Sequence, residues 1–204
     1  MDDANKRIWR QRIGLYGGVL LMLVVCWVFI WAYRTITIRR YGADLTPKKQ
    51  VESVQTPFYS MEDPAYAQQE MGQTGYTIGQ QGSLLCALSM AAGARGVQVD
   101  PAQLNLPELY EDNVYQVERI DEVPGLENAV FESYTSFAED RVREILGRGE
   151  ACLCRVLRDG NAHWLVITGT QEDAFLALDP AGDGQAQPLE EKVYVLARLV
   201  VDKG

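Results

Sequence analysis

The sequence predicts an α+β domain attached to one membrane-spanning helix near the N-terminus. Three observations lead to this prediction: an uncharged apolar stretch at residues 13–33, an apolar run of helix-forming residues at 83–92, and four strand-like segments after residue 150. A half rich in helices followed by an antiparallel sheet is typical of α+β domains. With 204 residues, of which 47% are hydrophobic, the chain is long enough for one such domain and one anchor.

Residues 13–33 carry no charge and are rich in Leu, Val, Trp and Phe. A helix of this length is about 30 Å long, which matches the hydrocarbon core of a bilayer. Aromatic residues lie near its ends, where the membrane–water interface favours them: Tyr16, Trp27, Trp31 and Tyr33. The stretch is too long for a signal peptide and lacks a small-x-small cleavage site. We therefore expect a retained anchor whose partner is the lipid bilayer.

Basic residues flank this stretch almost equally, so the positive-inside rule leaves its direction nearly balanced. Four precede it and five follow it: Lys6, Arg7, Arg10 and Arg12, then Arg34, Arg39, Arg40, Lys48 and Lys49. Because the N-terminal tail (residues 1–12) is short, we expect it to stay inside the cell. The domain is then expected outside a cell membrane that the chain crosses once.

The excess of acidic over basic residues lies in residues 51–204, after the anchor. Residues 1–50 contain nine Lys/Arg and three Asp/Glu, whereas residues 51–204 contain ten Lys/Arg and 25 Asp/Glu. Such an acidic domain has no basic surface for phosphate backbones, which excludes nucleic acid as a partner. Residues 34–56 lack sustained periodicity, so a juxtamembrane linker is expected there and a folded domain at residues 57–204.

The sequence TIGQQGSLLCALSM, residues 77–90, predicts a buried helix preceded by a glycine-containing loop. Its residues are mostly good helix formers and are apolar nearly all round. Unpaired N–H groups and the positive dipole end at the start of such a helix stabilise an anionic nucleophile or an oxyanion. Two candidate nucleophiles lie there, Ser83 in the first turn and Cys86 one turn later.

Two further helices and an acidic segment are expected in the middle of the chain. Asp100 followed by Pro101 predicts the N-cap and first residue of a short helix toward Leu109. Residues 110–123 are acidic and irregular, which favours a solvated face over a rim that selects cationic substrates or partners. Apolar residues at helical spacing, closed by a glycine, predict a second helix at 136–147.

The last part of the chain predicts strands separated by turn-forming residues, at 151–157, 163–170, 174–179 and 192–201. His163, the single histidine of the protein, opens the second of these strands, and Asp179 ends the third. Taken alone, such a histidine is more often a packed or surface residue. An Asp before Pro180 is, taken alone, a common turn residue.

Residues 77–90 resemble the active-site helix motif of the bacteriocin-processing-type cysteine peptidases, a family of the papain-like superfamily. Three further segments are similar to this family and follow its order: GVQVDPAQLN at 96–105, AHWLVITG at 162–169 and LALDPAGDG at 176–184. The resemblance covers roughly three quarters of the chain, which makes it far more specific than one short motif. It implies a papain-like fold.

The resemblance also implies roles for individual residues. Ser83 occupies the position of the catalytic Cys, and His163 occupies that of the general base. Asp179 matches the acidic partner that orients the histidine through its Nδ1 hydrogen. Met61 stands where the oxyanion-stabilising Gln is expected, and a thioether donates no hydrogen bond. We therefore expect a catalytically degenerate peptidase domain whose cleft binds a peptide or protein segment.

Three alternatives remain open at this point. In the first, Cys86 is the nucleophile and Gln80, six residues earlier as in papain, is the oxyanion donor, although a Cys in an apolar helix is usually inert packing. In the second, Ser83, His163 and Asp179 form an active serine hydrolase. In the third, the domain is a scaffold that acts through its surface. No cofactor is expected, and one His with scattered Cys does not form the ligand pattern of a zinc site.

Overall fold

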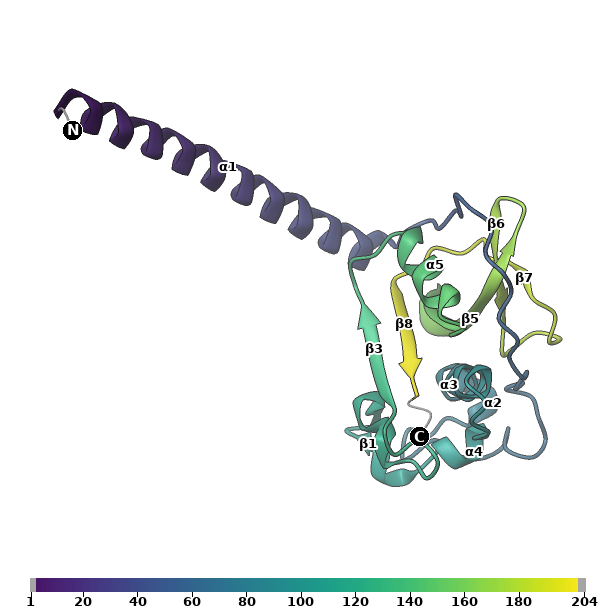
Figure 1. The fold of residues 1–204 in the computed structure, drawn as a ribbon. Helices are drawn as coiled ribbons and strands as arrows, with labels where there is room; N and C mark the ends of the chain where they lie inside the picture. The colour runs from purple at the N-terminus through teal and green to yellow at the C-terminus, as the bar shows by residue number, and fades with distance from the viewer. Residues whose placement is uncertain (1–2, 202–204) are drawn as a thin grey trace.

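The structure is a computed structural model that describes residues 3–201 of the chain. It confirms a mixture of helices and strands preceded by one long N-terminal helix (Figure 1). This helix, α1, covers Asp3–Tyr41 and projects away from the domain. Its part Tyr16–Tyr41 is long and apolar enough to cross a membrane, with a mean hydropathy of 2.1.

Helix α1 continues past the predicted anchor and ends where Gly42 follows it. Gly42 has a φ of 71°, in the left-handed region, and its N–H donates to the carbonyl of Ile38 at 2.9 Å. Glycine suits this position because a side chain is disfavoured at positive φ. The first eight residues of the expected linker therefore belong to the helix.

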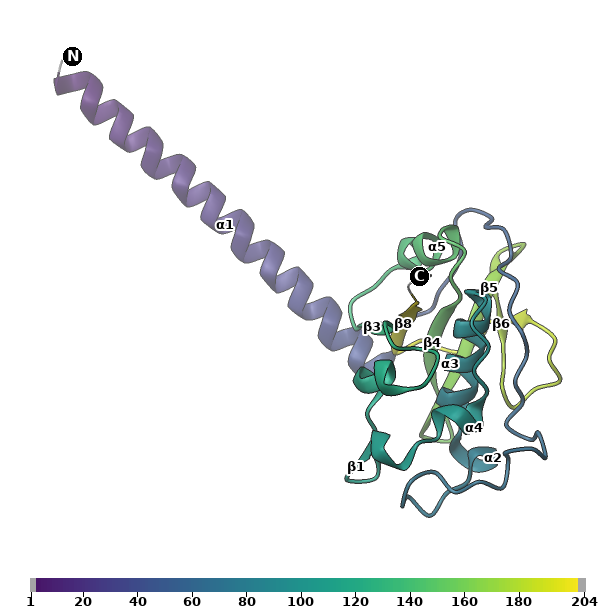
Figure 2. The same cartoon turned by 60° about the horizontal axis from the view of Figure 1, so that its bottom comes forward.

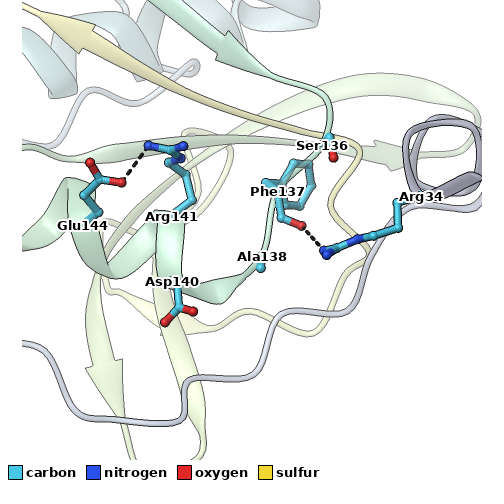
Figure 3. A pocket seen from close by; sticks show the side chains of 7 residues that line it. All are labelled: Arg34, Ser136, Phe137, Ala138, Asp140, Arg141 and Glu144. Carbon is cyan, nitrogen blue, oxygen red and sulfur yellow. Dashed lines mark hydrogen bonds and ion pairs between the residues drawn. The ribbon is translucent and has the colours of Figure 1, made fainter. Parts of the chain in front are cut away.

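The segment at 34–56, expected as a juxtamembrane linker, contacts the domain at several points. Ile38 is only 6% exposed and lies in an apolar core of the domain. Ala43 and Val193 exchange two backbone hydrogen bonds, of 2.8 and 2.9 Å. Arg34 Nη2 donates to the carbonyl of Phe137 at 3.0 Å (Figure 3). The partners lie far along the chain, so local periodicity does not reveal this packing.

Six antiparallel strands form the main sheet in the order β3-β8-β4-β5-β6-β7. Their bounds are β3 Val130–Tyr134, β4 Cys152–Arg158, β5 Asn161–Gln171, β6 Ala174–Leu178, β7 Gln187–Pro188 and β8 Val195–Val200. Strands β4, β5, β6 and β8 correspond to the four predicted strands, whereas β3 and β7 have no predicted counterpart. Strand β8 begins later than expected because Val193 pairs with Ala43 instead.

Helices cover both faces of this sheet. Helix α3, Ser83–Ala94, shares an apolar core with Leu153, Val166 and Ala197 on one face, and Figure 2 shows it running along the sheet. Helix α5, Glu139–Gly147, shares a second core with residues of the opposite face, including Ile167. The alternation of buried side chains along the central strands thus places α3 on one side and α5 on the other.

Helix α3 follows the short helix α2, Ile78–Gln81, with Gly82 between them. A Cβ at Gly82 would lie 2.5 to 2.8 Å from three atoms of Ile78, including backbone atoms. Only glycine fits this close approach, and the two helices can therefore follow each other without a longer loop.

The segment after α3 is more ordered than expected. Helix α4, Pro101–Leu104, has the predicted Asp100 cap but stops early, because Pro107 holds Leu106 in an extended conformation. A 3₁₀ turn η1 (Pro107–Leu109), the hairpin β1–β2 (Tyr110–Glu111 and Val114–Tyr115) and a second 3₁₀ segment η2 (Val117–Glu122) follow. The expectation of an irregular 110–123 was therefore wrong for the hairpin.

Candidate functional site

The first residue of α3 lies beside the start of β5. Ser83 is only 2% exposed, and its Oγ accepts a hydrogen bond from the backbone N–H of Trp164 at 3.2 Å. As the first residue of the helix, Ser83 is also close to the N–H groups that have no intrahelical partner. The structure therefore brings the predicted nucleophile position next to the strand that carries His163.

His163 and Asp179 form a hydrogen-bonded pair, as the sequence predicts. The distance between His163 Nε2 and Asp179 Oδ1 is 2.7 Å. The two residues come together because β5 and β6 are adjacent, with Val166 opposite Leu178. The expected use of Nδ1 was wrong, since the carboxylate contacts Nε2. Within the described residues Nδ1 has no partner, so this nitrogen is the one left for a reacting group.

Arg158, which sequence reasoning missed, holds the other side of Asp179. Its Nη1 donates to Asp179 Oδ2, and its Nη2 and Nε contact Glu191 Oε1 at 2.5 and 3.0 Å. Partial burial disfavours the charged form of Asp179, but hydrogen bonds from His163 and Arg158 outweigh it and hold the pKa of this carboxyl below its usual range. Asp179 therefore stays ionised and fixes the imidazole in place.

Ser83 and His163 line one open pocket of about 510 Å³. Its wall is formed by α2, the start of α3, the β1–β2 hairpin and the β4–β5 turn. The lining residues are Met71, Gln80, Gln81, Ser83, Leu84, Asn113, Val114, Tyr115, Arg158, Asn161, Ala162, His163 and Trp164. Amide, hydroxyl and apolar groups dominate this lining, and Arg158 is the charged residue in it.

The hairpin residues in this wall were not predicted. Asp112 and Asn113 have positive φ angles of 49° and 64°, which Asp and Asn tolerate better than most residues and which two-residue hairpin turns require. In the sequence, the adjacent Asp112 and Asn113 were therefore the feature from which the β1–β2 hairpin could have been predicted. The acidic residues of this segment are exposed and are not among those that line the pocket, which agrees with the solvated-face interpretation.

Cys86 and Met61 lie outside the pocket. Cys86 is fully buried, and burial raises the pKa of its thiol to about 12, so it is not a thiolate at neutral pH. Met61 is 5% exposed and packs in the core beside α3, while its N–H donates to the carbonyl of Pro180 at 2.8 Å. Its side chain is therefore a packing group, and the burial of Cys86 argues against the thiol nucleophile.

Gln80, the alternative oxyanion donor, does line the pocket. Its Oε1 accepts a hydrogen bond from the N–H of Thr77 at 3.0 Å, which orients the amide. Its Nε2 makes no hydrogen bond to any residue that the structure describes, so both of its N–H groups are available to a ligand. The structure thus separates Gln80 from Cys86, its proposed partner, and places it in the same pocket as Ser83.

Comparison of the chain with models of known protein families, with curated proteins and with solved structures gave no match. The pocket geometry is therefore the basis for any function assigned to the chain.

Proposed function

We propose that this chain is a membrane-anchored, papain-like peptidase domain that has lost catalysis and binds a peptide or protein segment in its pocket. One observation carries the proposal. Ser83 lies at the start of α3 in the same pocket as His163, yet its Oγ accepts a hydrogen bond from the backbone N–H of Trp164. Within the described residues, no hydrogen bond joins Ser83 to His163.

The chemistry of serine at this position supports the loss of activity. A Cys at a helix start beside a histidine ionises and becomes a strong nucleophile, whereas a Ser hydroxyl needs a base that removes its proton during attack. Here the Ser83 hydroxyl oxygen accepts from the backbone N–H of Trp164, and within the described residues the hydroxyl makes no hydrogen bond to the imidazole that would have to remove its proton. Met61 supplies no donor where the resemblance expects one.

The composition of the pocket supports a peptide as its occupant. Gln80, Gln81 and Asn161 offer both donors and acceptors, which suit the alternating N–H and C=O groups of an extended backbone. Leu84 and Val114 add apolar surface for side chains. A small number of polar groups in a partly apolar cleft is the usual composition of a ligand site.

We also propose that α1 anchors the domain in the cell membrane, with the domain outside. The length and hydropathy of Tyr16–Tyr41 support anchorage, and the resemblance to a peptidase family with many exported members supports the direction. Protease added to intact cells should then digest the domain. A domain that resists digestion until the cells are lysed would place it inside.

Replacement of Ser83 by Cys tests the proposal directly. We expect the wild-type chain in detergent to cleave no member of a broad peptide library, and Ser83→Cys to react with iodoacetamide at pH 7. The new thiol would sit at a helix start in the pocket that contains His163, which favours the thiolate. Mass spectrometry should place the adduct on residue 83 and leave the buried Cys86 unmodified.

The matched control is Ser83→Cys combined with His163→Gln, which keeps a polar side chain near Asp179 but removes the imidazole. Labelling should be at least about tenfold slower in this double variant, because less thiolate forms. Cleavage of peptides by the wild-type chain would contradict the loss of catalysis, and Ser83→Ala would then show whether Ser83 attacks.

A serine hydrolase is the second candidate, and the pair formed by His163 and Asp179 favours it. A fluorophosphonate probe, which reacts with activated serines, decides between the two functions. Labelling of Ser83 that disappears in His163→Gln would support the hydrolase.

A further inference from the structure

A second pocket, of about 460 Å³, lies between the end of α1 and the sheet face on which α3 packs. Strands β3, β4, β5 and β8 supply most of its wall, and α1 supplies Arg39. The lining residues are Arg39, Phe131, Ser133, Thr135, Arg155, Trp164, Tyr194 and Val195. Two arginines and three hydroxyl groups thus face a space that no carboxylate lines in the described part of the chain.

Arg155 has no partner for its charge within the described residues. Its Nε is buried without a hydrogen bond, and its guanidinium forms no ion pair in the described part of the chain. A buried donor without a partner costs roughly 1–3 kcal/mol, and more when the group is charged. By contrast, Arg158 and Arg198 on the same sheet are paired with carboxylates. The lone guanidinium indicates that an anion completes this pocket.

Arg39 is held over the pocket by the docking of α1. Ile38, its neighbour, is buried in the domain core, and the Ala43–Val193 backbone pair fixes the chain just after the helix. The ring of Tyr194 lies against Gly42, where a Cβ would come within 3.1 Å of a ring carbon. These contacts fix the backbone of Arg39 beside the pocket, and its exposed side chain is among those that line it.

The position of Arg39 along α1 matches the head-group layer of a bilayer. It lies six residues beyond Tyr33, the end of the uncharged stretch, which corresponds to about 9 Å of helix. A long arginine side chain reaches back toward the interface. Residues 34–49 contain five basic residues and one acidic residue, so this level of the protein is positive although the domain beyond it is acidic.

We propose that this pocket binds a phosphate group, with the head group of a phospholipid as its source. The planar guanidinium of Arg155 would contact two phosphate oxygens, and Arg39 would neutralise the remaining charge. Ser133, Thr135 and Tyr194 supply neutral donors for the other oxygens. This site goes beyond the proposed peptide pocket, and only its lipid source rests on the proposed anchorage of α1.

Native mass spectrometry of the full chain in non-ionic, phosphate-free detergent solution tests the proposal with phosphatidylglycerol as the probe. Diacylglycerol with the same acyl chains is the reference without phosphate. We expect phosphatidylglycerol to be retained more strongly, and Arg155→Gln to weaken its binding by roughly tenfold or more. Arg155→Lys should bind phosphatidylglycerol more strongly than Arg155→Gln but less strongly than the wild type, since lysine has the positive charge but lacks the planar guanidinium that contacts two oxygens at once.

Arg39→Gln is the second variant, and Arg40→Gln is its matched control. Both arginines are exposed and adjacent on α1, but only Arg39 lines the pocket. We expect weaker lipid binding in Arg39→Gln and no change beyond about twofold in Arg40→Gln, and neither exposed change should prevent folding. Equal loss in the two variants would show a non-specific charge effect and overturn the pocket.

Calorimetric titration with inorganic phosphate, without lipid, distinguishes the sources. If Arg155→Gln weakens the binding of inorganic phosphate but not the binding of phosphatidylglycerol, the pocket is a phosphate site. Its ligand is then a soluble phosphate compound and not a lipid. Binding of neither probe, or binding that both Arg155→Gln and Arg39→Gln leave unchanged, overturns the proposal.

Discussion

At the scale of single residues, Asp179 connects two parts of the candidate site. It accepts from His163 on one oxygen and from Arg158 on the other, and Arg158 continues to Glu191. The carboxylate is therefore held on both sides, and the imidazole that it orients has little freedom to turn. This arrangement explains how a histidine at the edge of an open pocket keeps a defined orientation without a direct bond to Ser83.

The ionised form of Asp179 should stabilise the fold in a pH-dependent way. Because its pKa is lowered in the folded protein, its contribution is complete above the ordinary carboxyl pKa of about 3.9 and is lost as the pH falls below it toward the folded pKa. We expect Asp179→Asn to lower the urea midpoint of the full chain in detergent, most strongly above about pH 5. The difference from the wild type should shrink between about pH 5 and pH 3.

Asp173→Asn is the control for the substitution itself, since Asp173 is exposed and forms no ion pair within the described residues. An exposed substitution of this kind usually changes stability by less than about 0.5 kcal/mol, so its urea midpoint should stay close to that of the wild type. A difference for Asp179→Asn that stays constant down to pH 3 would show that the ionised carboxylate does not stabilise the fold.

At the scale of elements, the position of Ser83 depends on how α2 meets α3. Gly82 brings the two helices into contact because it has no side chain to meet Ile78. The contact places Gln80 and Gln81 in the same pocket wall as Ser83. A longer connection would separate the amide donors from the start of α3, so the glycine determines the shape of the site.

Gly82→Ala should therefore destabilise the domain. The backbone at Gly82 (φ −77°) is compatible with alanine, so the effect comes from overlap with Ile78, and we expect a loss of about 1–3 kcal/mol in the free energy of unfolding. Gly147→Ala, in α5, is the matched control, because its Cβ would meet no atom within 4 Å. It should be neutral or stabilising by up to about 1 kcal/mol. Urea unfolding of the two variants measures the contrast, and equal values would exclude the proposed overlap.

At the scale of the whole molecule, α1 and the domain are joined by packing as well as by the chain. Arg34 donates to the carbonyl of Phe137 in the loop before α5 (Figure 3). Ile38 lies in the core, and Ala43 exchanges backbone hydrogen bonds with Val193. A helix that is docked in this way holds the domain at a defined height and angle relative to its axis. The pocket proposed for a peptide and the pocket proposed for a phosphate group share Trp164 as a lining residue.

The docking of α1 can be measured with a pair of isoleucines two residues apart. Ile38→Ala removes a buried side chain and should lower the free energy of unfolding by about 2 kcal/mol or more. Ile36→Ala removes the same atoms from a side chain that is 63% exposed, and we expect a change within about 0.5 kcal/mol. Equal effects in urea unfolding of the full chain would mean that α1 does not pack on the domain.

Local patterns in the sequence determined the long apolar helix, the buried helix α3, the cap at Asp100 and four strands. One of these strands contains His163, and another ends just before Asp179. Hydropathy, helix caps and turn residues act over a few neighbouring positions, so a single sequence displays them. Only the tertiary structure decided that Ser83 bonds to Trp164, 81 residues away, that Arg158 holds Asp179, and that the expected linker packs on the sheet. These contacts depend on which strand lies beside which, and that order follows from burying both faces of the sheet at once.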